Sequence, residues 1–297
     1  MVTIPALALA GCGDEGDVSW LRQPLSAFCT VDVTGKGTRQ VETDYLPHVV
    51  ACENGAADTE ALKAQAVAAR SYLYYKIKQE GGSICDGTGC QVYTCSNKPQ
   101  QKHFDAVRAT SGQVLVYSGV VICGFYVAGA KPSTPTCEPL PTDPDPTKTE
   151  KYVTYNEGRS GADVTQSTLG WVDPGNIYNR GCKSQNGAHC LSLAGRPYPE
   201  ILRFYYGADI QLVTAPGSCV NPPPDGAPAG ERQPPRLDGG STADWQPGTD
   251  LPPPGGDRSE RLGGGGCACR FGQGPRPVPV ALVLLFGTLL LRRRPRR

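Results

Sequence analysis

The stretch ETDYLPHVVACE at residues 42–53, followed by EALKAQAVAARSY at residues 60–72, predicts two consecutive helices. In the first, Thr43 is a suitable N-cap and Pro47 falls in the first turn, where its missing N–H is tolerated. The second is rich in alanine, a strong helix former, and we expect it to span 58–78. Glu53 ends the first helix, where the helix dipole favours the protonated form of a carboxyl group.

Further helices and a hairpin follow along the chain. A helix is predicted over 98–110, and QVLVY, the turn Ser118-Gly119 and VVICGFYV predict a hairpin over 113–127. Residues 132–149 form a long Pro/Thr/Asp loop, and a last helix is expected over 198–206. The pattern predicts one α+β domain over residues 28–219, with helices packed on short antiparallel strands.

Cysteine usage indicates an oxidising compartment. Of 13 cysteines, ten lie in the predicted domain, enough for five disulfides. Buried free thiols are the alternative. The spacing leaves the pairing open, although Cys182 and Cys190 flank the loop SQNGA and would close a compact disulfide loop. The ten candidates are Cys29, Cys52, Cys85, Cys90, Cys95, Cys123, Cys137, Cys182, Cys190 and Cys219.

Both ends of the chain indicate export. Residues 1–12 are apolar and end in Leu-Ala-Gly-Cys, which resembles a bacterial lipobox with Cys12 as the lipidated residue, although no Lys or Arg precedes it. An ordinary signal peptide is the alternative. Residues 220–266 are rich in Pro and Gly and predict a disordered linker.

The C-terminal segment, residues 267–297, contains two cysteines, an apolar run over 278–291 and an arginine-rich end. Fourteen helical residues span about 21 Å, less than the roughly 30 Å of a bilayer core. The arrangement resembles the MYXO-CTERM sorting tail, and a plain short membrane anchor is the alternative. We therefore expect a cell-envelope protein of a Gram-negative bacterium, in the periplasm, outer membrane or cell surface.

Two motif blocks and two shorter elements between them resemble the SpoIID/LytB family. The first block is the helix pair quoted above, and the second is SQNGA at 184–188 with the ending YPEILRFYY at 198–206. Gln91-Val92-Tyr93 and Gly112-Gln113-Val114-Leu115 match the shorter elements in order. The family includes lytic transglycosylases, which cut peptidoglycan glycan strands, and amidase enhancers without demonstrated chemistry of their own.

The resemblance implies one catalytic carboxylic acid, Glu53, acting as acid and then base, with no metal or cofactor. Its alternative role is an ion pair with Lys63 or Arg70. The resemblance also implies peptidoglycan as partner, with an amidase as a second possible partner. The net charge of +1 gives no indication of nucleic-acid binding. Candidate substrate-binding residues are Gln65, Arg70, Gln91, Tyr93, Ser184 and Gln185.

The chain departs from the family pattern in two places. The family often has Gly-His-Gly-Val-Gly-Met before its SQ pair; here residues 178–183 stand in that register, so Asn179 stands at the histidine position. The Gly-Gly-Thr element after the hairpin is not evident. These departures favour a non-catalytic peptidoglycan-binding or amidase-activating module as the alternative function, and a purely structural surface protein is a third reading. A zinc site remains a minor alternative for Cys85, Cys90, Cys95 and His103.

Overall fold

The computed structural model describes residues 24–221, except for the side chains of Gln79 and Glu80. The predicted lipidation site Cys12, nearly all of the 220–266 linker and the sorting tail lie outside the described residues. Within 24–221, no helix combines the length and apolar character needed to cross a membrane. The limits of the domain, 28–219, stay a prediction.

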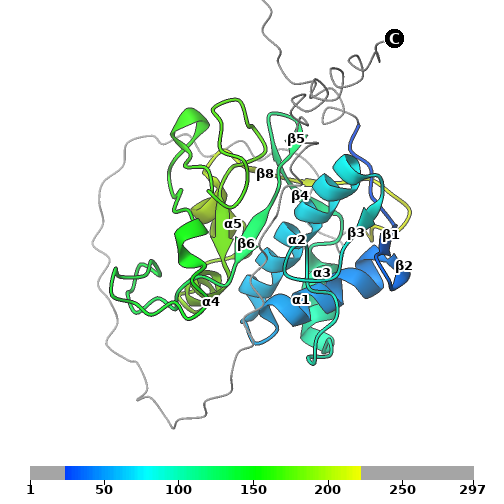
Figure 1. Cartoon of the computed structure of the whole chain (residues 1–297), viewed down its shortest axis with the longest axis horizontal. Coiled ribbons are helices and arrows are strands. Elements are labelled where there is room, and N and C mark those ends of the chain that lie inside the picture. The colour runs from blue at the N-terminus through cyan, green and yellow to red at the C-terminus, as the bar shows by residue number, and fades with distance from the viewer. Residues whose placement is uncertain (1–23, 222–297) are drawn as a thin grey trace, which may run out of the picture.

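The fold is α+β, as predicted, and is built around one central helix (Figure 1). The helices are α1 (Leu46–Asn54), α2 (Thr59–Glu80), α3 (Gln101–Ala109), α4 (Gln185–Leu193) and α5 (Tyr198–Tyr206). A short π-helix, η2 (Val41–Tyr45), leads into α1, and two 3-10 turns are η3 (Glu150–Tyr152) and η4 (Gly161–Asp163).

Three small sheets complete the fold. The strands are β1 (Thr30–Val33), β2 (Gly37–Gln40), β3 (Ser83–Ile84), β4 (Gln113–Tyr117), β5 (Val120–Val121), β6 (Phe125–Val127), β7 (Cys182–Ser184) and β8 (Gln211–Thr214). They are ordered β2-β1-β3, β5-β4-β8 and β6-β7. The pairs β1–β2, β4–β5 and β4–β8 are antiparallel, as expected, whereas β1–β3 and β6–β7 are parallel.

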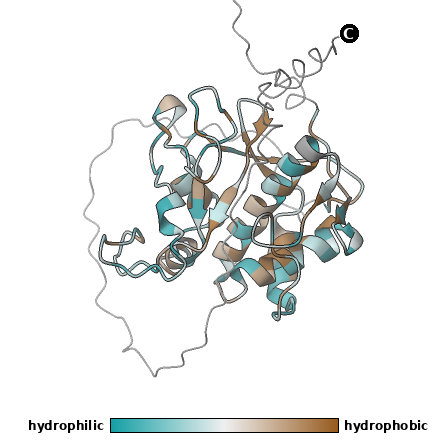
Figure 2. Ribbon diagram, in the orientation of Figure 1, coloured by the Kyte–Doolittle hydropathy of each residue, from teal (hydrophilic) through white to brown (hydrophobic). Residues whose placement is uncertain are grey.

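Helix α2 is buried on all sides. Between Ala61 and Tyr75 every residue except Lys63 is buried, and α1, α3, α4 and α5 all contact this helix. Its many alanines let the neighbouring backbones approach closely, and strands β4, β5 and β6 add a mainly hydrophobic surface (Figure 2). A helix without a solvated face is typical of a core element.

The predicted second strand of the hairpin, 120–127, is divided. Residues Val120–Val121 pair with β4, but Phe125–Val127 pair in parallel with β7. Gly124 lies between the two parts, and a Cβ there would stand 2.8 Å from the carbonyl oxygen of Ala68 on α2. The chain leaves β4 at this point because it packs directly on the α2 backbone. The pairing with β7 brings the start of α4 next to α1.

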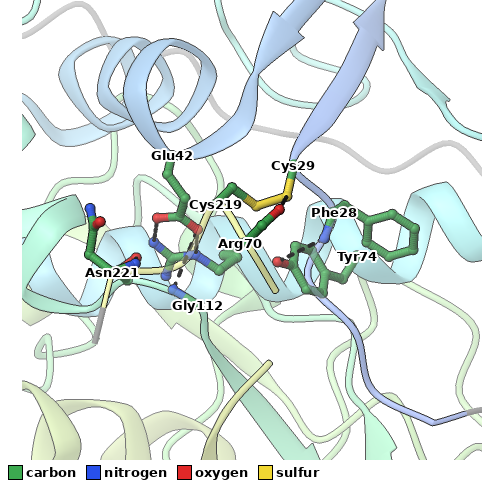
Figure 3. The surroundings of a disulfide bond; sticks show 10 residues. Phe28, Cys29, Glu42, Arg70, Tyr74, Gly112, Cys219 and Asn221 are labelled. Carbon is green, nitrogen blue, oxygen red and sulfur yellow. Dashed lines mark hydrogen bonds and ion pairs between the residues drawn. A yellow bond between two sulfur atoms is a disulfide. The ribbon is translucent and has the colours of Figure 1, made fainter. Parts of the chain in front are cut away.

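Four disulfides join eight of the ten candidate cysteines: Cys29–Cys219, Cys52–Cys95, Cys85–Cys90 and Cys137–Cys190. The expected Cys182–Cys190 loop was wrong, because Cys190 on α4 is bonded to the 132–149 loop instead. Cys123 and Cys182 are both buried. The Cys29–Cys219 bond ties together the two ends of the described chain (Figure 3).

Candidate active site

Glu53 lies near the C-terminal end of α1 and is one of the buried residues of that helix. It is 8% exposed, and both carboxylate oxygens accept hydrogen bonds. Oε1 accepts from the backbone N–H of Val92 at 2.8 Å, and Oε2 accepts from Nε2 of Gln185 at 3.2 Å. Three segments far apart in sequence therefore hold one carboxyl group.

The loop that presents the Val92 N–H is braced by two disulfides. Cys52–Cys95 attaches the loop to α1 beside Glu53, and Cys85–Cys90 closes the loop itself. Oδ1 of Asp86 accepts from the backbone N–H groups of Tyr93 and Thr94 at 2.9 and 3.0 Å. The Val92 donor is thus held in place before any ligand arrives, which is the preorganisation that an active site requires.

Lys183 is a fourth group of the site that the sequence patterns did not single out. Its side chain is fully buried, and its Nζ donates to Oε1 of Gln65 on α2 at 2.7 Å. Burial lowers the pKa of Lys183 to about 7, and the charges of Cys182 and Glu53 act in the opposite direction. Its one sequence signal is a lysine at the methionine position of the family motif.

Gln185 is the candidate substrate-binding residue that the structure brings to Glu53. Gln185 bonds to the carboxylate, and Gln65 bonds to Lys183. The Nε2 of Gln65 is buried without a hydrogen-bond partner among residues 24–221.

Arg70 belongs to the interior of the fold instead. Its Nε and Nη2 each donate to a carboxylate oxygen of Glu42 at 2.7 Å (Figure 3). Its Nη1 donates to the carbonyl of Gln113. The guanidinium is fully buried, so the expectation that it lines a substrate groove was wrong. Lys63, the other ion-pair partner considered for Glu53, pairs with Glu60.

Three further candidates are engaged within the fold. The side chain of Gln91 is fully buried and bonded to Tyr45, Tyr126 and the Ala69 carbonyl. Tyr93 stacks on Tyr45 with ring centroids 5.6 Å apart and donates to Asp44. Ser184 is the N-cap of α4, a helix that the sequence analysis missed. All three side chains are thus engaged within the fold, and their role in substrate binding stays a prediction.

Asn179, which stands in place of the family histidine, is also buried and structural. Its Oδ1 accepts from the Ser167 N–H at 3.0 Å, and its Nδ2 donates to the carbonyls of Ser167 and Trp171 at 2.8 and 2.7 Å. These bonds fasten the loop that carries the half-exposed side chain of Trp171. An amide supplies the donor and acceptor side by side, as this clamp requires.

The residues considered for zinc do not fit a metal. Cys85, Cys90 and Cys95 are all in disulfides, so they offer no thiolate. His103 accepts from the Gln100 N–H through Nδ1, and its Nε2 bonds to the Gly55 carbonyl. Within 24–221 no group of three or more His, Cys, Asp and Glu side chains is placed to hold a metal ion.

A cavity of about 230 Å³ lies elsewhere, between the N-terminal segment, the end of α2 and the β5-β4-β8 sheet. Its lining is mainly aliphatic and contains no carboxyl group. Lys78 lines it, thirteen residues beyond Gln65, which corresponds to about 20 Å along the helix. This cavity is therefore separate from the Glu53 site.

Fold and site together define a disulfide-braced α+β domain with one desolvated, preorganised carboxylic acid. Residues 37–117 match the family model SpoIID, described as stage II sporulation protein. The match confirms the resemblance: this part of the chain is a SpoIID domain, and it contains Glu53, Gln65 and the Gln91-Val92-Tyr93 loop. No curated protein matches the chain.

Proposed function

We propose that this protein is a peptidoglycan lytic transglycosylase that cleaves glycan strands with Glu53 as acid and then base. The SpoIID domain links the chain to the bacterial cell wall. The observation that carries the finer proposal is the setting of Glu53, a nearly buried carboxyl group held by a backbone N–H and by Nε2 of Gln185. A general acid needs a carboxyl group that is held in one orientation, and these two bonds hold Glu53 in this way.

The proposed reaction uses one carboxyl group. Glu53 gives its proton to the glycosidic oxygen, and the bond from that oxygen to the anomeric carbon of the muramic acid breaks. The Glu53 carboxylate then takes the proton of the primary hydroxyl of the same muramic acid, whose oxygen attacks the anomeric carbon. The products are a free sugar hydroxyl and a 1,6-anhydromuramic end. Water is not consumed, in contrast with hydrolysis by paired carboxylates.

The two hydrogen bonds to Glu53 have a role in both steps of this reaction. They stabilise the carboxylate that exists between the two proton transfers, and they fix the direction in which its oxygens point. Because Val92 and Gln185 belong to different segments, the carboxylate is held from two sides. The disulfide Cys52–Cys95 keeps the first of these donors beside α1.

A second candidate function is a non-catalytic peptidoglycan-binding module that stimulates an amidase. The observation in its favour is that Asn179, at the position of the family histidine, is buried and bonded to Ser167 and Trp171. In that case the chain would bind glycan without changing it.

The deciding experiment is digestion of peptide-free glycan strands by the purified full chain, followed by mass spectrometry. A lytic transglycosylase leaves anhydromuramic ends, lighter by one water than hydrolytic ends. We expect these products from the wild type and their loss in Glu53→Gln. The matched control is Glu200→Gln, since Glu200 is exposed on α5, and it should retain full activity.

Two outcomes would reject the proposal. One is binding of strands without any product while a purified amidase is stimulated, which would establish the second candidate. The other is equal product from Glu53→Gln and wild type. Thermal unfolding of each variant shows whether a loss of product reflects chemistry or folding.

We further propose that the protein is exported to the cell envelope, where glycan strands are its partner. Four disulfides in residues 24–221 support this location, since such bonds persist in oxidising compartments. Retention by lipid on Cys12 or by the C-terminal segment remains a proposal, and mass spectrometry of the protein purified from membranes would test it.

A further inference from the structure

Cys123 and Cys182 complete the ten cysteines of the predicted domain, beside the eight that the four disulfides join. Both are buried, with exposed fractions of 1% and 0%. The Cα atoms of the four joined pairs are 5.4–5.8 Å apart. Thiol–disulfide exchange that joins eight cysteines of one domain also acts on a further pair, provided that the two sulfur atoms can meet.

The backbone brings the two cysteines to neighbouring strands. Cys182 is the first residue of β7, and its register partner is Phe125, the first residue of β6. Neighbouring strands lie about 4.8 Å apart, so register partners stand side by side. Cys123 comes only two residues before Phe125, and its distance from Cys182 therefore depends on how the chain runs through Gly124.

A tight turn at Gly124 keeps Cys123 close to this strand pair. The Phe125 N–H donates to the Cys123 carbonyl at 2.7 Å, which is the i to i+2 bond of a γ-turn. In an extended chain the two residues would be about 7 Å apart, and the turn shortens this separation. The Cys123 N–H donates to the Tyr178 carbonyl at 3.0 Å. The segment 178–182 is thus bonded to Cys123 at its start and paired with Phe125 at its end, at Cys182.

The side chain of Tyr206 lies near both sulfur atoms. Its hydroxyl donates to the Phe125 carbonyl at 2.7 Å, so it marks the interior face of the β6–β7 pair. Burial raises the pKa of Tyr206 well above its usual value, and the charges of Cys182 and Cys123 add to the rise. Because such charge effects act at short range, both side chains are directed to the region of this hydroxyl. The side chains therefore agree with the backbone contacts.

We propose that Cys123 and Cys182 form a fifth disulfide, which fastens β6 to the start of β7. A disulfide needs Cα atoms about 4.4–6.8 Å apart, a range that includes the spacing of neighbouring strands. The oxidant is the disulfide of a thiol oxidoreductase. One cysteine thiolate attacks that disulfide and forms a mixed disulfide, and the second thiolate then releases the oxidant. Two cysteine thiols are oxidised, and the oxidant leaves as a dithiol that carries their two protons.

This bond acts on the candidate site through β7. Cys182 lies three residues before Gln185, whose Nε2 donates to Glu53. The bond holds the start of the short segment that presents Gln185, as Cys52–Cys95 holds the loop that presents the Val92 N–H. Each of the two donors to Glu53 then has a disulfide of its own. The consequence for catalysis rests on the proposed function, whereas the pairing itself does not.

The experiment is a peptide map of the full chain, purified after export and denatured with iodoacetamide in the absence of reductant. Trypsin and chymotrypsin together cut after Tyr117, Phe125, Arg180 and Lys183, so each possible pairing has its own mass. We expect peptide 118–125 to be linked to peptide 181–183, two hydrogen atoms lighter than the separate peptides, and to be released by reduction. Alkylation of both cysteines, or a link from either one to another cysteine, overturns the inference.

The variant Cys123→Ala should make the Cys182 thiol reactive toward iodoacetamide in the denatured chain. Cys85→Ala is the matched control, because it exposes the Cys90 thiol and leaves the link between 118–125 and 181–183 in place. Cys123→Ala, Cys182→Ala and the double variant should lower the denaturation midpoint by nearly the same amount, since each removes one and the same bond. Losses that add up in the double variant overturn the inference. If the variants do not fold, the wild-type map decides, and a confirmed link without glycan cleavage rejects the proposed function alone.

Discussion

The Nε2 of Gln185 donates to Oε2 of Glu53 at 3.2 Å, across 132 residues of sequence. This bond joins the two motif blocks into one site. Replacing Gln185 by Leu removes this donor from a nearly buried carboxylate oxygen. We expect the free energy of unfolding to fall by about 1–3 kcal/mol in chemical denaturation. Gln101→Leu is the control, because Gln101 is exposed, and should change stability by less than about 0.5 kcal/mol. Equal effects of the two variants would contradict this role.

Breaking the buried ion pair of Arg70 and Glu42 should cost more stability than losing the Gln185 hydrogen bond. In Glu42→Gln the guanidinium keeps its charge but loses its carboxylate, and breaking a buried ion pair in this way costs about 3–5 kcal/mol. Glu157→Gln, which breaks the more exposed pair with Arg196, should cost at most about 1 kcal/mol. Urea unfolding of both variants measures the difference. If Glu42→Gln were as stable as wild type, the assignment of Arg70 to the interior would be wrong.

The disulfides differ in the length of chain that they close. Cys29–Cys219 spans 190 residues, and Cys85–Cys90 spans five. The chain-entropy relation gives about 5 kcal/mol for the first and about 2 kcal/mol for the second. We therefore expect the double alanine variant of the long-range pair to unfold at a lower denaturant concentration than that of the short-range pair. The reverse order would show that strain or local contacts outweigh loop closure.

The bonds of Asn179 predict that replacing it by the family histidine lowers stability and does not raise glycan cleavage. An imidazole cannot supply the adjacent donor and acceptor that Ser167 and Trp171 use, and the site is buried. We expect Asn179→His to lose about 1–3 kcal/mol of stability and to gain no glycan cleavage. Asn97→His, at an exposed position, serves as the control. A rise in product from Asn179→His would show that the clamp is dispensable and that the histidine has a catalytic role here.

Lys183 predicts a rise of stability with pH. The unfolded chain keeps this proton up to its ordinary pKa of 10.5, whereas the folded chain releases it at about 7. The unfolded state therefore binds more protons between these values, and the free energy of unfolding increases with pH there. From pH 7 to 9 this amounts to roughly 2–3 kcal/mol. Denaturation of wild type and Lys183→Met at both pH values measures it. Parallel pH profiles would contradict the burial of an ionisable amine.

Local patterns predicted the helices well. The last helix, 198–206, is confirmed at both ends, and α2 differs from its prediction by one residue at its start and two at its end. Both helices have clear helical propensity and a glycine after their last residue. The short strands β1, β2 and β8 and helix α4 were missed, since segments of four to nine residues hold little periodic signal.

The sequence by itself determined the family, the α+β class and the position of Glu53 at a helix end, because motifs and helix signals lie within short stretches of chain. Only the tertiary structure decided which cysteines pair, that Arg70 forms an ion pair with Glu42, and that Lys183 is buried and bonded to Gln65. Apart from the local Cys85–Cys90 bond, these relations join residues from 28 to 190 positions apart. Local pattern does not encode which distant groups meet, whereas packing around α2 brings them together and removes the water that would otherwise separate their charges.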